Sequence, residues 1–168
     1  MKRRHQTLVA LGLACLVCST VQAADATYSS DTLTTEAALT AAQAALASCQ
    51  GSGYQVAVSV TDRSGTPIAV LRDRYAGPHT PETATRKAYT AASFRMSTNE
   101  LAEATQPGKA TSGIRHLNHI LALGGGLPIE AAGSLVGAIG ISGAPGGDAD
   151  QACAQAGIDA IQADLDFQ

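Results

Sequence analysis

The chain has 168 residues, which fits one domain with its own apolar core. It has a net charge of −3, no Trp and 4 % aromatic residues. Proteins that bind nucleic acid use basic surfaces and stacking rings, so these values argue against a nucleic-acid partner.

The first 23 residues have the three parts of an export signal. Two arginines and a lysine follow the first Met, residues 8–17 are apolar, and Val-Gln-Ala forms a small-residue cleavage site. The apolar run is shorter than the about 20 residues that a spanning helix needs, and no later segment could cross a membrane. We therefore expect cleavage before Ala24 and a periplasmic or secreted location.

After removal of residues 1–23, eight basic residues face 14 acidic ones, and the net charge falls to near −6. Residues 24–32 are predicted to be a linker, and residues 33–168 to form one domain. Only Cys49 and Cys153 remain in the processed chain, in a compartment where thiols become oxidised. They lie near the ends of the first and last predicted helices. We predict that they form a disulfide; the alternative is two buried thiols packed apart.

The hydrophobic pattern predicts an α/β (α+β) domain. Its expected strands form two hairpins: 54–61 with 67–72, and 127–130 with 135–142. Helices are expected at 35–49, 81–94, 101–105 and 150–165. Residues 114–123 fit either a helical turn or an extended run. Two hairpins favour an antiparallel sheet flanked by helices over a parallel sheet.

The starts of the first and second predicted helices can be described in more detail. Thr34 is the expected N-cap of the first helix, whose apolar face is predicted to contain Leu39, Ala42, Leu46 and Cys49. In the second helix, Thr80 is expected to accept the first free backbone amides, with Pro81 at the first helical position.

Most of the candidate functional residues lie between residues 77 and 94. Its helix has a stripe of alanines that would let it lie close to a sheet: Ala84, Ala88 and Ala91. Beside this stripe the helix presents Arg86 and Lys87, and His79 precedes it. This combination predicts a polar-edged pocket; the alternative is a core helix with a solvated basic face.

His79 is the main candidate ligand. A neutral imidazole held on a loop can ligate haem iron, and nearby cations could bind the carboxylates of haem. Those cations are Arg72, Arg74, Arg86 and Lys87. We predict a haem site in which His79 binds the iron; a solvated basic cluster is the alternative.

The other motifs are weaker. His116 and His119 could share a helical face as a metal pair, but no Cys or acidic residue lies nearby in sequence. The glycines at 137–147 match neither G-x-G-x-x-G nor a P-loop, and Asp148 and Asp150 would repel an anion from the following helix. The chain also lacks the G-x-S-x-G of a hydrolase.

A family resemblance rests on four ordered stretches: DRSGTPIAVLRD, GPHTPETATRKAYTAASF, LALGGGLPI and VGAIGISGAPGGDADQACAQAGIDAI. Together they resemble the GlcG/HbpS family of haem-binding-like proteins, over about residues 33–163. The resemblance implies a profilin-like antiparallel sheet between helices and a tendency to form homo-oligomers. It also implies that some relatives bind haem or iron outside the cytoplasm, and that a related domain is fused to corrinoid enzymes. Lys87 and residues 124–126 match family motifs, whereas the choice of His79 comes from its chemistry alone.

We therefore expect an exported, non-enzymatic protein that binds haem or another tetrapyrrole, for sequestration or sensing of haem or iron. The rival hypothesis is an enzyme or enzyme accessory that acts on a small organic acid, with Lys87 or His79 as the acid/base group. A third hypothesis is a structural oligomer without a ligand.

Overall fold

The computed structural model describes residues 26–166. The predicted export signal lies outside this range. Residues from Asp31 onward group into one compact unit, and residues 26–30 form no helix or strand. Within the described range, no helix is both long and apolar enough to cross a bilayer.

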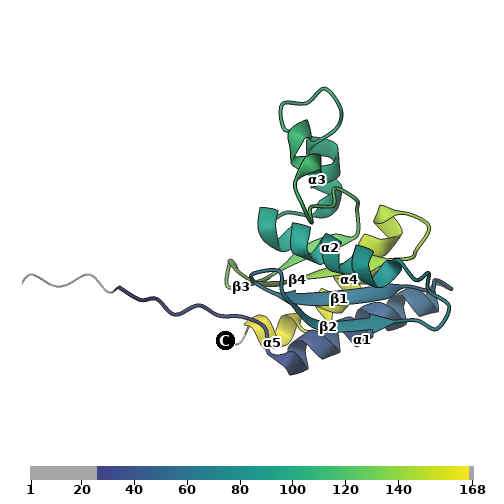
Figure 1. Cartoon of the computed structure of the whole chain (residues 1–168). Helices are drawn as coiled ribbons and strands as arrows, with labels where there is room; N and C mark the ends of the chain where they lie inside the picture. Colours follow the sequence, from purple (N-terminus) through teal and green to yellow (C-terminus); the bar gives the residue numbers. More distant parts are fainter. Residues whose placement is uncertain (1–25, 167–168) are drawn as a thin grey trace, which may run out of the picture. The chain divides into compact units, whose positions relative to one another are not determined.

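The centre of the unit is a four-stranded antiparallel sheet with the order β2-β1-β4-β3 (Figure 1). Its strands are β1 (Ala57–Asp62), β2 (Pro67–Arg72), β3 (Gly126–Ala131) and β4 (Ser134–Ser142). β1 lies between β2 and β4, so that Val58 is opposite Leu71 on one side and Ile141 on the other. Both predicted hairpins and the antiparallel α+β class are confirmed.

Helices cover both faces of the sheet (Figure 1). The helices of the unit are α1 (Thr35–Gly51), α2 (Thr80–Phe94), α3 (Thr98–Ala104), the 3-10 helix η1 (Ser112–His116), α4 (Gly147–Asp159) and α5 (Gln162–Asp166), and α3 projects away from the sheet beyond α2. α1, α4 and α5 pack on one face, and α2 packs on the other. We call these the α1–α4 face and the α2 face.

The α1–α4 face holds the main apolar core. Val58 and Val60 of β1 point toward it because side chains along a strand alternate between faces, and Val56, just before the strand, also joins the core. Ile139 and Ile141 of β4 join them. The predicted disulfide is present: Cys49 of α1 is bonded to Cys153 of α4, with 5.5 Å between their Cα atoms. The two helices are therefore crosslinked over a filled core.

On the α2 face the strands carry small residues. Ala88 and Ala91 of α2 pack on Ala138 of β4, as the alanine stripe predicts. At Gly140 a Cβ atom would lie 2.1 Å from the carbonyl oxygen of Ala84. The absence of a side chain at this glycine lets the backbone of α2 lie almost directly on the sheet.

The structure differs from the sequence prediction at the first helix and at the last. Leu39 is 40 % exposed, because α1 packs through a face rotated toward Ala38, Ala41 and Ala45. The last helix begins at Gly147 instead of Asp150, and it is divided into α4 and α5 by a break after Asp159.

The start of α2 also differs. The predicted N-cap, Thr80, is the first helical residue, and His79 occupies the cap position without a side-chain cap bond. The Thr80 hydroxyl instead donates to the Gly77 carbonyl at 2.8 Å, because it lies inside the turn. Pro81 has no N–H, so one fewer amide needs a cap.

Candidate functional site

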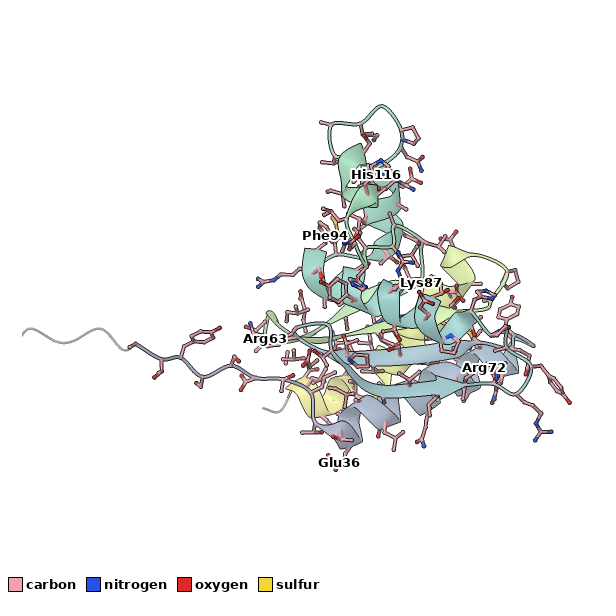
Figure 2. All side chains as sticks on the ribbon, viewed as in Figure 1. Glu36, Arg63, Arg72, Lys87, Phe94 and His116 are labelled. Atoms are coloured by element: carbon pink, nitrogen blue, oxygen red, sulfur yellow. A yellow bond between two sulfur atoms is a disulfide. The ribbon has the colours of Figure 1, made fainter. Side chains whose placement is uncertain are left out.

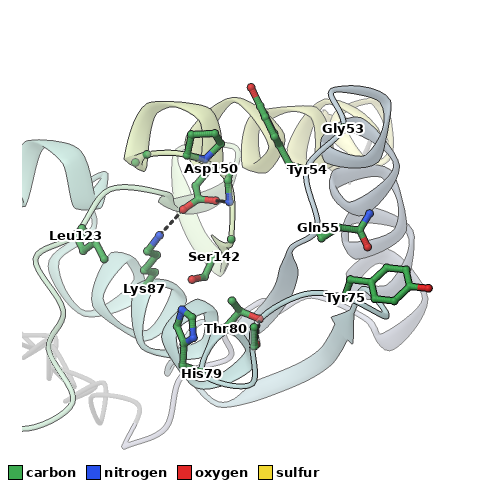
Figure 3. A pocket seen from close by; sticks show the side chains of 16 residues that line it. Gly53, Tyr54, Gln55, Tyr75, His79, Thr80, Lys87, Leu123, Ser142 and Asp150 are labelled. Carbon is green, nitrogen blue, oxygen red and sulfur yellow. Dashed lines mark hydrogen bonds and ion pairs between the residues drawn. The ribbon is translucent and has the colours of Figure 1, made fainter.

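A pocket of about 580 Å³ lies at the end of the sheet where β4 leads into α4 (Figure 3). Its wall is formed by the turn after α1, the loop between β2 and α2, the α2 helix, the loop before β3, and the segment that runs from the end of β4 into α4. Residues that line it include Tyr54, Tyr75, His79, Thr80, Lys87, Leu123, Ser142 and Asp150. The pocket falls within the range of about 300–1,000 Å³ that is typical of small-molecule sites.

A buried ion pair forms part of this wall. Lys87 is 1 % exposed and Asp150 is 4 % exposed, and Nζ of Lys87 lies 2.7 Å from Oδ2 of Asp150. Nζ also donates to the carbonyl oxygen of Ile141 at 2.8 Å. The second carboxylate oxygen, Oδ1, accepts the backbone N–H of Ala144 at 3.0 Å. Each charged group thus has a second hydrogen bond besides the pair.

The pair connects helices from opposite faces of the sheet. Lys87 lies on the buried side of α2, and Asp150 lies in the first turn of α4. The two meet at the end of β4, where Lys87 binds the carbonyl oxygen of Ile141, and Gly125 lies next to both. Gly125 has φ +112°, and a Cβ there would lie 2.5 Å from Cβ of Asp150 and 3.0 Å from Nζ of Lys87. Only glycine leaves space for the pair at this position.

Burial dominates the electrostatics of both groups. It lowers the pKa of Lys87, and the hydrogen bond and charge of Asp150 oppose this effect in part. Burial also raises the pKa of Asp150, against the influence of Lys87 and the Ala144 amide. Desolvation disfavours the charged form of each group. A neutral amine beside a neutral carboxyl is therefore closer in free energy to the ion pair than it would be in water.

The structure brings together two of the five predicted haem-site residues, whereas Arg72 donates to the carbonyl oxygen of Ala76 and does not line the pocket. His79 and Lys87 line the same pocket, with His79 exposed at its edge (Figure 3). Arg86 does not: its guanidinium donates to the carbonyl oxygen of Ile120 at 3.0 Å. Arg74 is exposed and does not line the pocket.

The prediction that Lys87 offers its charge to the carboxylates of a ligand needs correction. Its charge is already paired inside the protein, because α2 turns this residue toward the sheet and α4 instead of toward solvent. Asp150 is the functional candidate that the sequence analysis missed. A signal was available in its spacing, since Asp150 lies three residues before Cys153 and so shares the buried side of α4.

The suggested metal pair is not formed. His116 ends η1 and is exposed, whereas His119 lies beyond that helix with φ +65° and packs edge-on against Tyr89. His116 also lies far from Lys87 (Figure 2). Between residues 26 and 166, no three His, Cys, Asp or Glu side chains are grouped to hold a metal ion.

Comparisons with known proteins find similar sequences and structures over most of the folded unit. A family model described as "Haem degrading protein HbpS-like" matches residues 33–159. The solved structure of a double mutant of HbpS from Streptomyces reticuli is 38 % identical with a TM-score of 0.76, and the match covers 83 % of this chain and 94 % of that one. A PduOC–haem complex is 33 % identical with a TM-score of 0.73, covering 77 % and 95 % of the two chains.

A further similarity involves a larger protein. The corrinoid adenosyltransferase PduO of Salmonella typhimurium is 36 % identical over 103 residues, which are 60 % of this chain. The chain spans only 31 % of the length of that protein.

Proposed function

The chain belongs to the HbpS-like family, and from this premise we propose that it is an exported haem-binding protein. The haem would occupy the pocket between α2 and the β4–α4 loop, with His79 as the ligand of the iron. The observation that carries the proposal is an imidazole at the edge of an open pocket, in a fold shared with a structure described as a haem complex.

The residues of the pocket fit this ligand. His79 is exposed, and its side chain makes no helix-cap bond that would compete with a metal. Tyr54, Tyr75 and Leu123 supply apolar surface for a macrocycle, and the exposed Arg74 next to Tyr75 could bind its carboxylates. When bound, haem would supply an iron centre whose reactivity depends on its axial ligand and surroundings.

Two features of the chain support export. The first 23 residues have the pattern of an export signal. The Cys49–Cys153 disulfide is of a kind that persists in oxidising compartments. We propose that the protein lies in the periplasm or is secreted, as a homo-oligomer that sequesters or senses haem. Sedimentation of the purified protein would test the oligomeric state.

A hemin titration followed by absorbance tests the binding proposal. We expect a saturable Soret shift at micromolar hemin. His79→Ala should weaken binding by about tenfold or more, equivalent to about 1.4 kcal/mol, and change the ligand-field bands. His119→Ala is the matched control, since this histidine lies outside the pocket. Absence of a saturable shift would overturn the proposal, and unchanged spectra for His79→Ala would overturn the ligand assignment.

The same experiment separates binding from degradation. The matching family model is described as haem degrading, and degradation would bleach the Soret band after a reductant is added in air. We propose a non-enzymatic role, for which the bound spectrum should persist. Loss of the band that requires the folded protein would overturn that part of the proposal.

A further inference from the structure

Lys87 is buried but lies at the wall of an open pocket. Lysines are mostly exposed, and fully buried ones are rare unless paired. Pairing with Asp150 accounts for the burial of Lys87, but it does not account for the position of the amine at the wall of a cavity. Here the side chain is 1 % exposed, yet it is among the residues that line the pocket (Figure 3).

We propose that the amine of Lys87 forms an imine with a small neutral aldehyde that enters this pocket, and that Asp150 carries the proton between the amine and the carbonyl oxygen. This inference does not depend on haem binding.

The surroundings of the amine leave space for such a reaction. An ammonium group has three N–H donors, and two of them are taken by Ile141 and Asp150. For the third, no partner is found in the described part of the chain. Nearby wall residues are small, such as Ser142, Ala144 and Gly147. A two- or three-carbon compound can therefore approach without displacing a large side chain.

The atoms and charges of the step balance. The ammonium first gives one proton to Oδ2 of Asp150, and rotation about the Cε–Nζ bond turns the lone pair toward the pocket. The nitrogen then attacks the carbonyl carbon, and the carbonyl oxygen takes the proton held by Asp150. The resulting carbinolamine loses its hydroxyl as water, which takes a second proton from nitrogen. The product is a protonated imine, and Asp150 is again a carboxylate.

Two electrostatic properties favour this step. Desolvation lowers the pKa of Lys87, and a desolvated lysine is the form used as an amine nucleophile. In addition, the protonated imine keeps one positive charge at the same atom. Asp150 therefore keeps its ionic partner, and no buried charge is left uncompensated at the end of the reaction.

The charge of the pocket selects the type of carbonyl compound. Its lining contains one amine, one carboxylate and the imidazole of His79. The amine is the only Lys or Arg among the lining residues, and Asp150 already neutralises it. A 2-oxo acid would bring a second carboxylate next to Asp150, whereas a neutral aldehyde adds no charge. This argues against the small organic acid considered from the sequence.

Reductive trapping tests the proposal directly. The purified protein would be incubated with acetaldehyde and cyanoborohydride at neutral pH, and ethylation of each lysine measured by peptide mass spectrometry. Lys109 is an internal comparison, because it is exposed and does not line this pocket. We expect Lys87 to be labelled several-fold faster than Lys109, because burial lowers the pKa of its amine and the pocket can hold the aldehyde next to it. Equal labelling, or labelling of Lys109 alone, would overturn the proposal.

Variants and unfolding provide the controls. In guanidinium the preference should disappear, because the pocket is lost. Lys109→Arg should leave the labelling of Lys87 unchanged, and Lys87→Arg should remove the preferred adduct. Asp150→Asn keeps a similar shape but cannot carry the proton. It also removes the charge that raises the pKa of Lys87, so the two proteins are compared in alkaline buffer, where the amine is free in both. Lys87 should label more slowly in the variant, and an unchanged rate would overturn the role given to Asp150. His119→Ala changes a histidine outside the pocket and should leave the labelling of Lys87 intact.

Discussion

The two faces of the sheet are closed in different ways, although the same strands form both. On the α1–α4 face, valines and isoleucines fill the space below the helices, and a disulfide ties α1 to α4. On the α2 face, small residues line the strands, and the buried Lys87–Asp150 pair ties α2 to α4. The α1–α4 face is stabilised by large buried apolar side chains and a disulfide. The α2 face is stabilised by the close approach of α2 to the sheet and by a buried ion pair.

This difference explains where the pocket lies. Large apolar side chains interdigitate and leave few voids, and the core between the sheet and the α1 and α4 helices is filled with them. The small residues of the α2 face let a lysine lie against the sheet, and its amine reaches the end of β4. The pocket and its buried lysine therefore lie next to the face of the sheet that is lined by small residues.

The largest expected effect of a substitution is the loss of the disulfide. Cys49→Ala combined with Cys153→Ala opens a loop with a sequence separation of 104 residues. For a loop of about 100 residues, the chain-entropy model gives about 4.7 kcal/mol of lost stability. Denaturant unfolding of the oxidised protein and the double variant would measure this difference. A loss below about 1 kcal/mol would mean that the apolar face holds together by packing alone.

Removing one partner of the ion pair should destabilise the protein somewhat less than removing the disulfide. Asp150→Ala leaves the charge of Lys87 buried without its partner, and we expect a loss of about 3 kcal/mol, the lower end for buried pairs, because the pocket admits water. Lys87→Met together with Asp150→Leu removes both charges and should recover most of the loss. A double variant as unstable as the single one would show that the pair supplies stability that packing cannot replace. Free energies of unfolding from urea titrations decide between these outcomes.

The close approach of α2 to the sheet can be tested by adding one methyl group to β4. Gly140→Ala places a Cβ where the carbonyl oxygen of Ala84 would be 2.1 Å away, and overpacking of this kind costs about 2 kcal/mol. Gly113→Ala is the matched control, since no atom lies within 4 Å of the added methyl group. We expect the control to change stability by less than about 0.5 kcal/mol. Equal effects would mean that α2 can move away from the sheet at little cost.

Most of the fold could be predicted because it depends on local signals. A tight turn at 62–65 joins the strands of the first hairpin, and a capping box between Ser97 and Glu100 begins α3, so neighbouring residues specify both elements. The face of α1 could not be predicted from its leucines. Its alanines pack against α4 because Gly157 lets the two helices touch, with the carbonyl oxygen of Ala41 2.7 Å from where a Cβ would be. That contact joins segments more than 100 residues apart.

The site was only partly predictable for the same reason. His79 and Lys87 are eight residues apart, and the start of a helix brings both to one pocket. Asp150 comes from a different helix on the other face of the sheet, so only the folded topology places it beside Lys87. Arg86 shows the converse: its position near His79 in sequence suggested a ligand contact, but a loop that follows η1 supplies its acceptors.

The smallest expected effect compares neighbours on one strand. Val58 and Ser59 are both fully buried, but Val58 points to the α1–α4 face and Ser59 to the α2 face. Val58→Ala should cost about 2 kcal/mol, because it leaves a cavity in a filled core. Ser59→Ala should cost less than about 1 kcal/mol, the value of one ordinary hydrogen bond. The bond that it loses is the one from the Thr85 hydroxyl at 3.2 Å, and that hydroxyl also approaches the Pro81 carbonyl at 2.9 Å, so it keeps an acceptor. Thermal and urea unfolding of the two variants would measure the difference. If Ser59→Ala proved as damaging as Val58→Ala, the α2 face would depend on its hydroxyl network as strongly as the opposite face depends on its apolar volume.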